Sequence, residues 1–363
     1  MTAETAQPLA IDGGQPVRAT PWPVDHPPPA AGDPEPAAAL AQTLATLLDV
    51  TADRIALFAR RDPAAAAATR AAAGDRVGGE LLIPALGGHA WLPVAEAAGL
   101  APVPVEVDAE TGAMAPRALA QAMIASPSAR AVVAVHPFGH PAALTELQRV
   151  AGTATLALVE DATSALGASE RGRHAGTVGA AGLFRLGAPG DPTAPFALVM
   201  PDAREGAPDP IDDAVARTAL AWLRAEPEAL ALRRRLAWEF TFGVRGMRGV
   251  AGMHHGRHVR LAYGRYVARL RRIVWKRPLE KTLAALRAEG IPCAAAFTAL
   301  PLHRDPAVLA ALGADDPRLA ADHFTVAARL PHEWIAFPLP ATGTQHEVDD
   351  AVAALRKIEA AGT

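Results

Sequence analysis

Two adjacent acids, Glu160 and Asp161, follow the apolar run LALV and precede a stretch of small residues. A run of this length and composition is typical of a buried strand, and ligands of open parallel sheets bind beyond the carboxyl ends of the strands. His136 occupies the same position after the run AVVAV. Asp161 and His136 are therefore candidate site residues, although the acid could equally cap a turn and the histidine could be a satisfied scaffold residue.

The composition limits the function classes. The chain has 363 residues, of which half are apolar and one fifth are charged, with a net charge of −3. The near-balanced charge indicates neither nucleic acid nor an anionic membrane as a partner. The single cysteine, Cys293, excludes a disulfide framework and a multi-cysteine metal site. The sequence shows no signal-peptide pattern and no bilayer-length apolar run, so we expect a cytoplasmic protein.

Two further clusters carry ionisable groups. In the segment GMHHGRHVR, which contains His254, His255 and His258, the first and last histidines are four residues apart and would share one face of a helix. No carboxylate or cysteine accompanies them, so an arginine-rich loop is favoured and no metal site is predicted. The run Arg233–Arg235 indicates a solvated helix face or, alternatively, contact with an acidic or phosphorylated ligand.

The elements that position these residues follow an alternating pattern. From residue 55 to 161, apolar runs of strand length alternate with helical segments, and two more strands are expected within 176–187 and 195–201. This pattern predicts parallel strands with crossover helices on both faces. Arginine-rich segments at 212–240 and 259–275 are expected to be long helices. The remainder, about 277–360, predicts a second and smaller α/β domain.

Several motifs in one order resemble the DegT/StrS-type sugar aminotransferases, which are fold type I enzymes dependent on pyridoxal 5′-phosphate (PLP). The motifs are LAIDGGQPVRATPWP, GELLIPAL with GLAPVPVEVDAETGAMAP, VVAVHPFGHPAALTELQRVA, LVEDATSALGASERGRHAGTVGAAGLF, and LRAEGIPCAAAFTALPLHRDPA with FPLP. The likeness runs from about residue 10 to 357 and is weakest at 20–75 and 187–275.

The resemblance implies a homodimer with active sites at the subunit interface. It also implies that Asp161 pairs with the pyridinium nitrogen of PLP, where a buried anion keeps the ring protonated and makes it an electron sink. The implied fold has a large domain with a mainly parallel sheet flanked by helices. We expect an irregular arm over 1–36, the large PLP-type domain over 37–240, a helical or loop connection at the dimer interface over 241–275, and the small α/β domain over 276–363.

The lysine that this resemblance requires is missing. Family members carry it a little under thirty residues after the aspartate, and that position falls at or near Gly190. The chain has three lysines, Lys276, Lys281 and Lys357. The first two lie in or after the arginine-rich segment near the second domain, and we do not expect them to substitute for the missing lysine.

The predicted phosphate site also departs from the family. The segment LFARRDPAAAAATRA replaces a Ser-Gly-Thr turn whose backbone amides would hold the phosphate. Asp62 repels a phosphate and Pro63 lacks an N–H, whereas Arg60 and Arg61 can still attract an anion.

Three more positions differ from the family. Arg185 replaces a serine, and Ser164 stands where the family has glutamine or histidine. Glycines occupy the expected position of the ring that stacks on PLP, so His89 or Trp91 takes that role only if the loop is shifted.

Three interpretations therefore stay open. The first is a degenerate homologue without transaminase activity, serving as a binding or partner subunit of a catalytic protein, or as a recruited enzyme, in sugar or natural-product biosynthesis. The second is an enzyme that holds PLP or pyridoxamine phosphate non-covalently, with Asp161 on the ring nitrogen. The third is a catalyst or binder for a small anionic or nucleotide-sugar ligand, without PLP, that uses Arg60, Arg61 and Arg185.

Overall fold

A seven-stranded sheet forms the centre of the larger part of the molecule. The computed structural model describes residues 7–23, 32–74, 78–188, 191–203, 210–253 and 256–362. The strand order is β1-β9-β8-β5-β4-β2-β3. Its strands are β1 Ile55–Phe58, β2 Glu80–Pro84, β3 Ala101–Val105, β4 Ala129–Val135, β5 Ala157–Asp161, β8 Ala181–Arg185 and β9 Phe196–Val199. Strands β3, β2, β4, β5 and β8 are parallel, and β9 is antiparallel to both β8 and β1.

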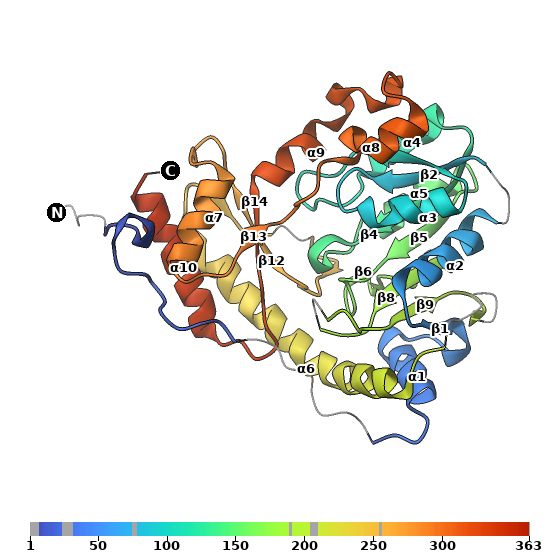
Figure 1. The fold of residues 1–363 in the computed structure, drawn as a ribbon, viewed down its shortest axis with the longest axis horizontal. Helices are drawn as coiled ribbons and strands as arrows, with labels where there is room; N and C mark the ends of the chain where they lie inside the picture. The colour runs from blue at the N-terminus through green and yellow to red at the C-terminus, as the bar shows by residue number, and fades with distance from the viewer. Residues whose placement is uncertain are drawn as a thin grey trace.

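Helices cover both faces of this sheet (Figure 1). Alternate side chains of one strand enter different cores: Leu82 packs with α1, α4, α5 and α6, whereas Leu81 and Ile83 pack with α2, α3 and α8. Burial on both faces explains why these strands read as continuous apolar runs. The helices are α1 Pro36–Leu48, α2 Arg61–Ala73, α3 Leu92–Ala97, α4 Pro116–Ala125, α5 Leu144–Gly152, α6 Asp213–Gly243 and α8 Pro306–Leu312. The predicted mainly parallel sheet flanked by helices is confirmed.

A second sheet has the order β10-β12-β14-β13 and lies against two helices. Its strands are β10 Val250–Ala251, β12 Tyr266–Leu270, β13 Ala294–Ala295 and β14 Trp334–Phe337, and its helices are α7 Leu279–Ala288 and α10 Gln345–Ala360. The 31-residue helix α6 connects the two parts, because it packs on α1 near its start and on α10 near its end (Figure 1). The cap of α6 is Asp212, whose side chain accepts from the Ala214 amide at 2.7 Å.

The long helix expected over 259–275 is wrong. This segment contains strand β11, Val259–Arg260, and strand β12, which lies inside the second sheet between β10 and β14. Tyr266, Val267 and Ala268 are all fully buried, and Tyr266 stacks on Phe240 with ring centroids 4.1 Å apart. Aromatic and β-branched residues that are buried on both faces of a sheet favour a strand. The arginines on either side of β12 had suggested a helical periodicity, which the apolar residues of β12 lack.

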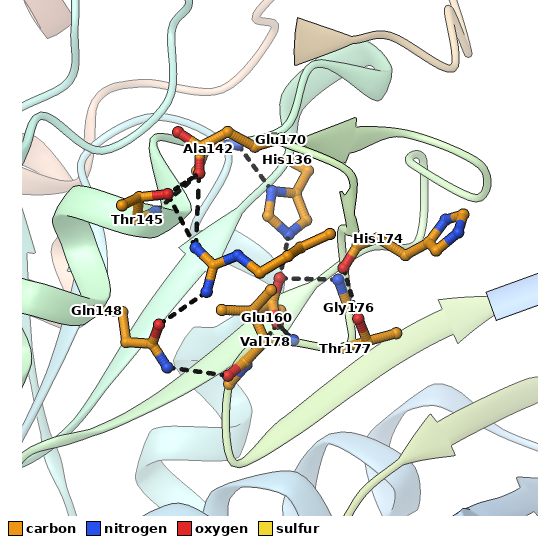
Figure 2. Close-up of polar contacts among 12 residues, drawn as sticks. His136, Ala142, Thr145, Gln148, Glu160, Glu170, His174, Gly176, Thr177 and Val178 are labelled. Atoms are coloured by element: carbon orange, nitrogen blue, oxygen red, sulfur yellow. Dashed lines mark hydrogen bonds and ion pairs between the residues drawn. The ribbon is translucent and has the colours of Figure 1, made fainter. Parts of the chain in front are cut away.

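The buried Glu160 links the end of β5 to the loop that follows a short hairpin. The strands of this hairpin are β6 Ser169–Glu170 and β7 Arg173–His174. His136 Nδ1 accepts the Ala142 amide at 2.9 Å, so its Nε2 carries the hydrogen that is donated to Glu160 at 3.1 Å (Figure 2). The other donors to Glu160, at 2.6–2.7 Å, are the amides of Gly176, Val178 and Gly179. Burial opposes ionisation of Glu160, but these hydrogen bonds outweigh it and lower the pKa of the carboxyl.

His303 is a buried side chain without a polar partner. It is 4% exposed, neither ring nitrogen has a hydrogen-bond partner among the described residues, and the ring stacks on Phe324 with centroids 4.4 Å apart. Burial, with a smaller contribution from Arg304, lowers the pKa of His303 to about 4. The folded protein therefore holds this ring in its uncharged form at neutral pH.

Replacing Glu160 by glutamine is expected to lower the free energy of unfolding by about 2–4 kcal/mol, because the new NH₂ group would face N–H donors and leave buried amides unsatisfied. Chemical denaturation at neutral pH measures the change. Glu146→Gln, on the exposed face of α5, is the matched control and should stay within about 0.5 kcal/mol of the wild type. An equal effect of both substitutions would contradict this role of Glu160.

Acid is expected to weaken the fold through His303. The unfolded chain takes up a proton near pH 6.5, whereas folded His303 resists protonation down to about pH 4. The unfolded state therefore binds more protons in this window, and stability falls by about 1.4 kcal/mol per pH unit as the pH drops. Denaturation of the wild type and of His303→Leu between pH 4 and 7 measures the difference between the two slopes. Parallel slopes would refute the assignment.

Candidate active site

The carboxyl ends of the parallel strands open into a cavity of about 840 Å³. Asp161 ends β5, Arg185 ends β8 and His136 follows β4, and all three line the cavity. Its far walls come from α6, from the connection between β11 and β12, and from segments beside the second sheet. The edge that the sequence predicted to hold a site therefore borders a cavity that reaches from the first sheet to the second.

Asp161 is 5% exposed and accepts four hydrogen bonds. Its Oδ1 accepts from the Thr163 hydroxyl at 2.6 Å and from the Thr163 amide at 3.2 Å. Its Oδ2 accepts from Trp91 Nε1 at 2.7 Å and from Arg61 Nη2 at 3.1 Å. A carboxylate offers about four lone-pair sites, so the chain's own donors use the full capacity of Asp161.

Arg61 and Trp91 form one unit against this carboxylate. Arg61 is the first residue of α2, and its guanidinium also donates to the Ala90 carbonyl at 2.6 Å. The guanidinium carbon lies 5.2 Å from the centroid of the Trp91 ring, within the range of a cation–π contact. Trp91 ends a 3₁₀ turn after β2 and is fully buried. A planar cation and an aromatic N–H thus meet Asp161.

The residues present do not fit PLP. A pyridinium N–H needs a free acceptor on Asp161, and the charge of Asp161 is already balanced by Arg61. The start of α2 is equally unsuited to a phosphate, because Asp62 is anionic and Pro63 has no amide hydrogen. The site as it stands offers PLP neither a partner for the ring nor a cradle for the phosphate.

The described lining of the cavity includes no lysine. Lys357 lies on α10, where it donates to the Gln15 carbonyl and pairs with Glu289 at 2.8 Å. Lys276 and Lys281 also lie outside the lining. Gly190, the position at or near which the sequence analysis predicts the family's lysine to fall, lies outside the described residues.

The arginines predicted for the site divide into two groups. Arg61 and Arg185 line the cavity, whereas Arg60, exposed at the N-cap of α2, is not part of its described lining. Arg185 donates to the carbonyls of Ala188 and Asp191. Burial lowers the pKa of Arg185, and the charge of nearby Asp191 partly opposes this. Because its hydrogen-bond acceptors are uncharged carbonyls, the guanidinium of Arg185 keeps its attraction for an anion.

The remaining predicted residues have different fates. Ser164, three residues after Asp161, is exposed and lines the cavity. His89 is not part of the described lining, since its Nε2 lies 2.5 Å from the Leu300 carbonyl oxygen. His136 belongs to the Glu160 network described above, which supports its interpretation as a scaffold residue.

The sequence analysis did not predict the roles of three residues at the site. Thr163 was not singled out, although a hydroxyl two residues after an aspartate is a recognisable turn signal. Trp91 was considered for stacking on a cofactor and instead hydrogen-bonds Asp161. Arg265, between β11 and β12, lines this cavity and a second one of about 680 Å³, and no hydrogen bond or ion pair to its guanidinium occurs within the described ranges. No motif marked Arg265 in advance.

The described residues show neither a cluster of metal-ligating side chains nor a helix that could span a membrane. Within them, no group of three His, Cys, Asp or Glu side chains is arranged to hold a metal ion. His254 and His255 lie outside the described ranges, and His258 lies in the turn before β11. None of the described helices has the length and apolar character needed to cross a bilayer.

Sequence comparisons match part of the chain to one family. Residues 64–185 match the model of the DegT/DnrJ/EryC1/StrS aminotransferase family. The erythromycin biosynthesis sensory transduction protein EryC1 of Saccharopolyspora erythraea is 39% identical over 107 residues, which is 28% of each chain. The L-glutamine:2-deoxy-scyllo-inosose aminotransferase of Streptoalloteichus tenebrarius is 32% identical over 206 residues, 49% of this chain and 46% of that enzyme. The chain thus spans less than half the length of these curated relatives.

Comparisons of structure extend over nearly the whole chain. DesI, solved in the presence of its TDP-sugar product, is 22% identical with a TM-score of 0.81, covering 97% of this chain and 96% of DesI. A DegT DnrJ EryC1 StrS aminotransferase from Brucella abortus is 20% identical with a TM-score of 0.76, covering 91% and 92% of the two chains. The resemblance predicted from the motifs is confirmed: residues 64–185 match the model of the DegT/DnrJ/EryC1/StrS aminotransferase family, and the chain has the fold of these solved aminotransferases.

Proposed function

We propose that this chain is a degenerate homologue of the nucleotide-sugar aminotransferases, a pseudoenzyme for lysine-dependent transamination. It acts as a ligand-binding or partner subunit, or as a recruited enzyme, in sugar or natural-product biosynthesis. One observation carries the proposal: all acceptors of Asp161 are used by Arg61, Trp91 and Thr163, in a cavity whose described lining contains no lysine. The biosynthetic setting is supported by the relatives, of which EryC1 is named for erythromycin biosynthesis.

The proposed ligand is small, anionic and extended, of the nucleotide-sugar type. The two cavities share Ala188, Gly264, Arg265 and Leu339, so a ligand could occupy both. Arg265 lines both cavities, and Arg185 supplies a second cation in the larger cavity. A cation that borders both cavities suits a phosphate or diphosphate group in the middle of the ligand. The TDP-sugar of DesI supports this ligand class by analogy.

The two other interpretations are less well supported. Non-covalent PLP or pyridoxamine phosphate would need Asp161 as the partner of the ring nitrogen, and Arg61 and Trp91 compete for that atom. Anion binding without PLP was predicted to use Arg60, Arg61 and Arg185. Arg61 and Arg185 line the cavity, whereas Arg60 is outside its described lining. A homodimer, as the family resemblance implies, is part of the proposal, and light scattering of the purified chain tests it.

Incubation with PLP followed by borohydride reduction should attach no stoichiometric label to the chain. The reason is that the described lining of the cavity contains no lysine to form an imine with a bound aldehyde. Intact-mass and peptide mass spectrometry check the result. Pyridoxine 5′-phosphate, which lacks the aldehyde, is the matched control. One equivalent of label fixed on Lys276, Lys281 or Lys357 would overturn the proposed function.

Thymidine diphosphate glucose is expected to bind the wild type. Arg265→Ala is expected to weaken this binding by about tenfold, because a charged hydrogen bond to phosphate is worth about 1.5 kcal/mol or more. Calorimetric titration at fixed salt measures both. Arg149→Ala, an exposed arginine on α5 that is outside both described linings, is the control and should bind as the wild type does. Equal affinity of all three proteins would rule out this placement of the ligand.

A further inference from the structure

We infer that Arg61 and Trp91 are a built-in replacement for the ring of a vitamin B6 cofactor, and that they close the cofactor site from within the chain. This inference rests on the proposed function and deepens it, since it names what took the place of the lost cofactor. The ligand that the pair excludes is a pyridinium ring of the pyridoxal class. The inference is based on one observation: the guanidinium of Arg61 and the indole N–H of Trp91 both donate to the same oxygen, Oδ2 of Asp161.

The charge balance explains why such a pair is needed. Asp161 is 5% exposed, and a carboxylate that far from water is unstable without a counter-charge. In the family this counter-charge is the pyridinium, as the resemblance implies. Here Arg61 supplies a positive charge at 3.1 Å, and 20% of its own side chain is exposed. The guanidinium therefore balances Asp161 whether or not any ligand is present.

The hydrogen-bond balance explains the role of Trp91. Its indole nitrogen lies 2.7 Å from Oδ2, closer than the guanidinium does, and within the described residues the indole N–H has no other acceptor. The ring belongs to the same buried core cluster as Ala64 and Ala68 of α2. Its N–H is therefore shielded from water, and Asp161 is the acceptor that satisfies it.

The local backbone brings both residues to the same place. Gly87 has φ of +77°, a conformation that a side chain would strain, and it turns the chain sharply after β2 into the 3₁₀ turn that ends at Trp91. Arg61 holds the turn by donating to Ala90, the residue before Trp91. The glycines that replace the family's stacking ring thus let the chain fold inward and deliver an indole to the carboxylate from one side.

The inference is tested by opening the site. Arg61→Ala and Trp91→Phe, singly and together, are titrated with pyridoxamine 5′-phosphate and compared with the wild type. The double variant is expected to bind at least tenfold more tightly than the wild type, because Oδ2 regains two lone pairs and Asp161 loses its counter-charge. Loss of an arginine alone would weaken phosphate binding, so general electrostatics cannot produce this gain. Arg60→Ala, its neighbour outside the described cavity lining, is the matched control and should show no gain.

Two further measurements keep the test decisive. Asp161→Asn in the double variant must remove the gain, since an amide is a poor partner for a pyridinium; a gain that persists would overturn the inference. If Trp91→Phe does not fold, a double-mutant cycle of Arg61→Ala and Asp161→Asn on the unfolding equilibrium replaces it. The expected coupling is at least tenfold in the unfolding constant, and additive effects would overturn the inference.

The outcomes separate the inference from the proposed function. A wild type that binds pyridoxamine 5′-phosphate as tightly as the folded double variant does would defeat both. A wild type that binds none, with a folded double variant that binds no better, would defeat the inference alone. The proposed function would then still stand on the results with PLP and borohydride.

Discussion

The buried carboxylate at the end of β5 is the constraint on which the rest of the site depends. A central strand of a parallel sheet ends in the interior, so an acid at that position must find partners or lose its charge. Glu160 and Asp161 are adjacent and therefore point to opposite faces of the sheet. Glu160 satisfies its charge with three amides and His136, which anchors the hairpin loop. Asp161 faces the cavity and satisfies its charge with Arg61, Trp91 and Thr163.

The fold was predictable because its pattern is redundant. Five parallel strands buried on both faces produce apolar runs that no solvent-exposed strand would show, and the helices between them repeat the signal several times. The segment 259–275 lacked that redundancy. Its strand β12 is five residues long and lies between arginines, so the apolar signal was short and the charged flanks dominated the prediction.

For the candidate site, the sequence predicts departures from the family's pattern, but it does not predict which side chains meet Asp161. Gly190, Pro63 and Ser164 each stand where the resemblance implies another residue type, and such a difference is visible in a sequence. Which side chains contact Asp161 depends instead on how the chain folds in three dimensions. Trp91 and Arg61 are thirty residues apart in the chain and meet only because α2 and the turn after β2 pack on the same sheet edge. Nothing in the local sequence of either residue specifies Asp161 as its partner.

A retained fold and a retained aspartate therefore do not imply a retained reaction. The cavity walls come from strand ends, α6 and segments beside the second sheet, all of which are held by packing. The chemistry that the resemblance implies depends instead on a few side chains. A pyridinium beside an aspartate can accept electrons from a bound substrate. A guanidinium in the same place is a cation with no low-lying acceptor orbital. Arg61 thus balances the charge of Asp161 without supplying the electron-accepting chemistry that a pyridinium would provide.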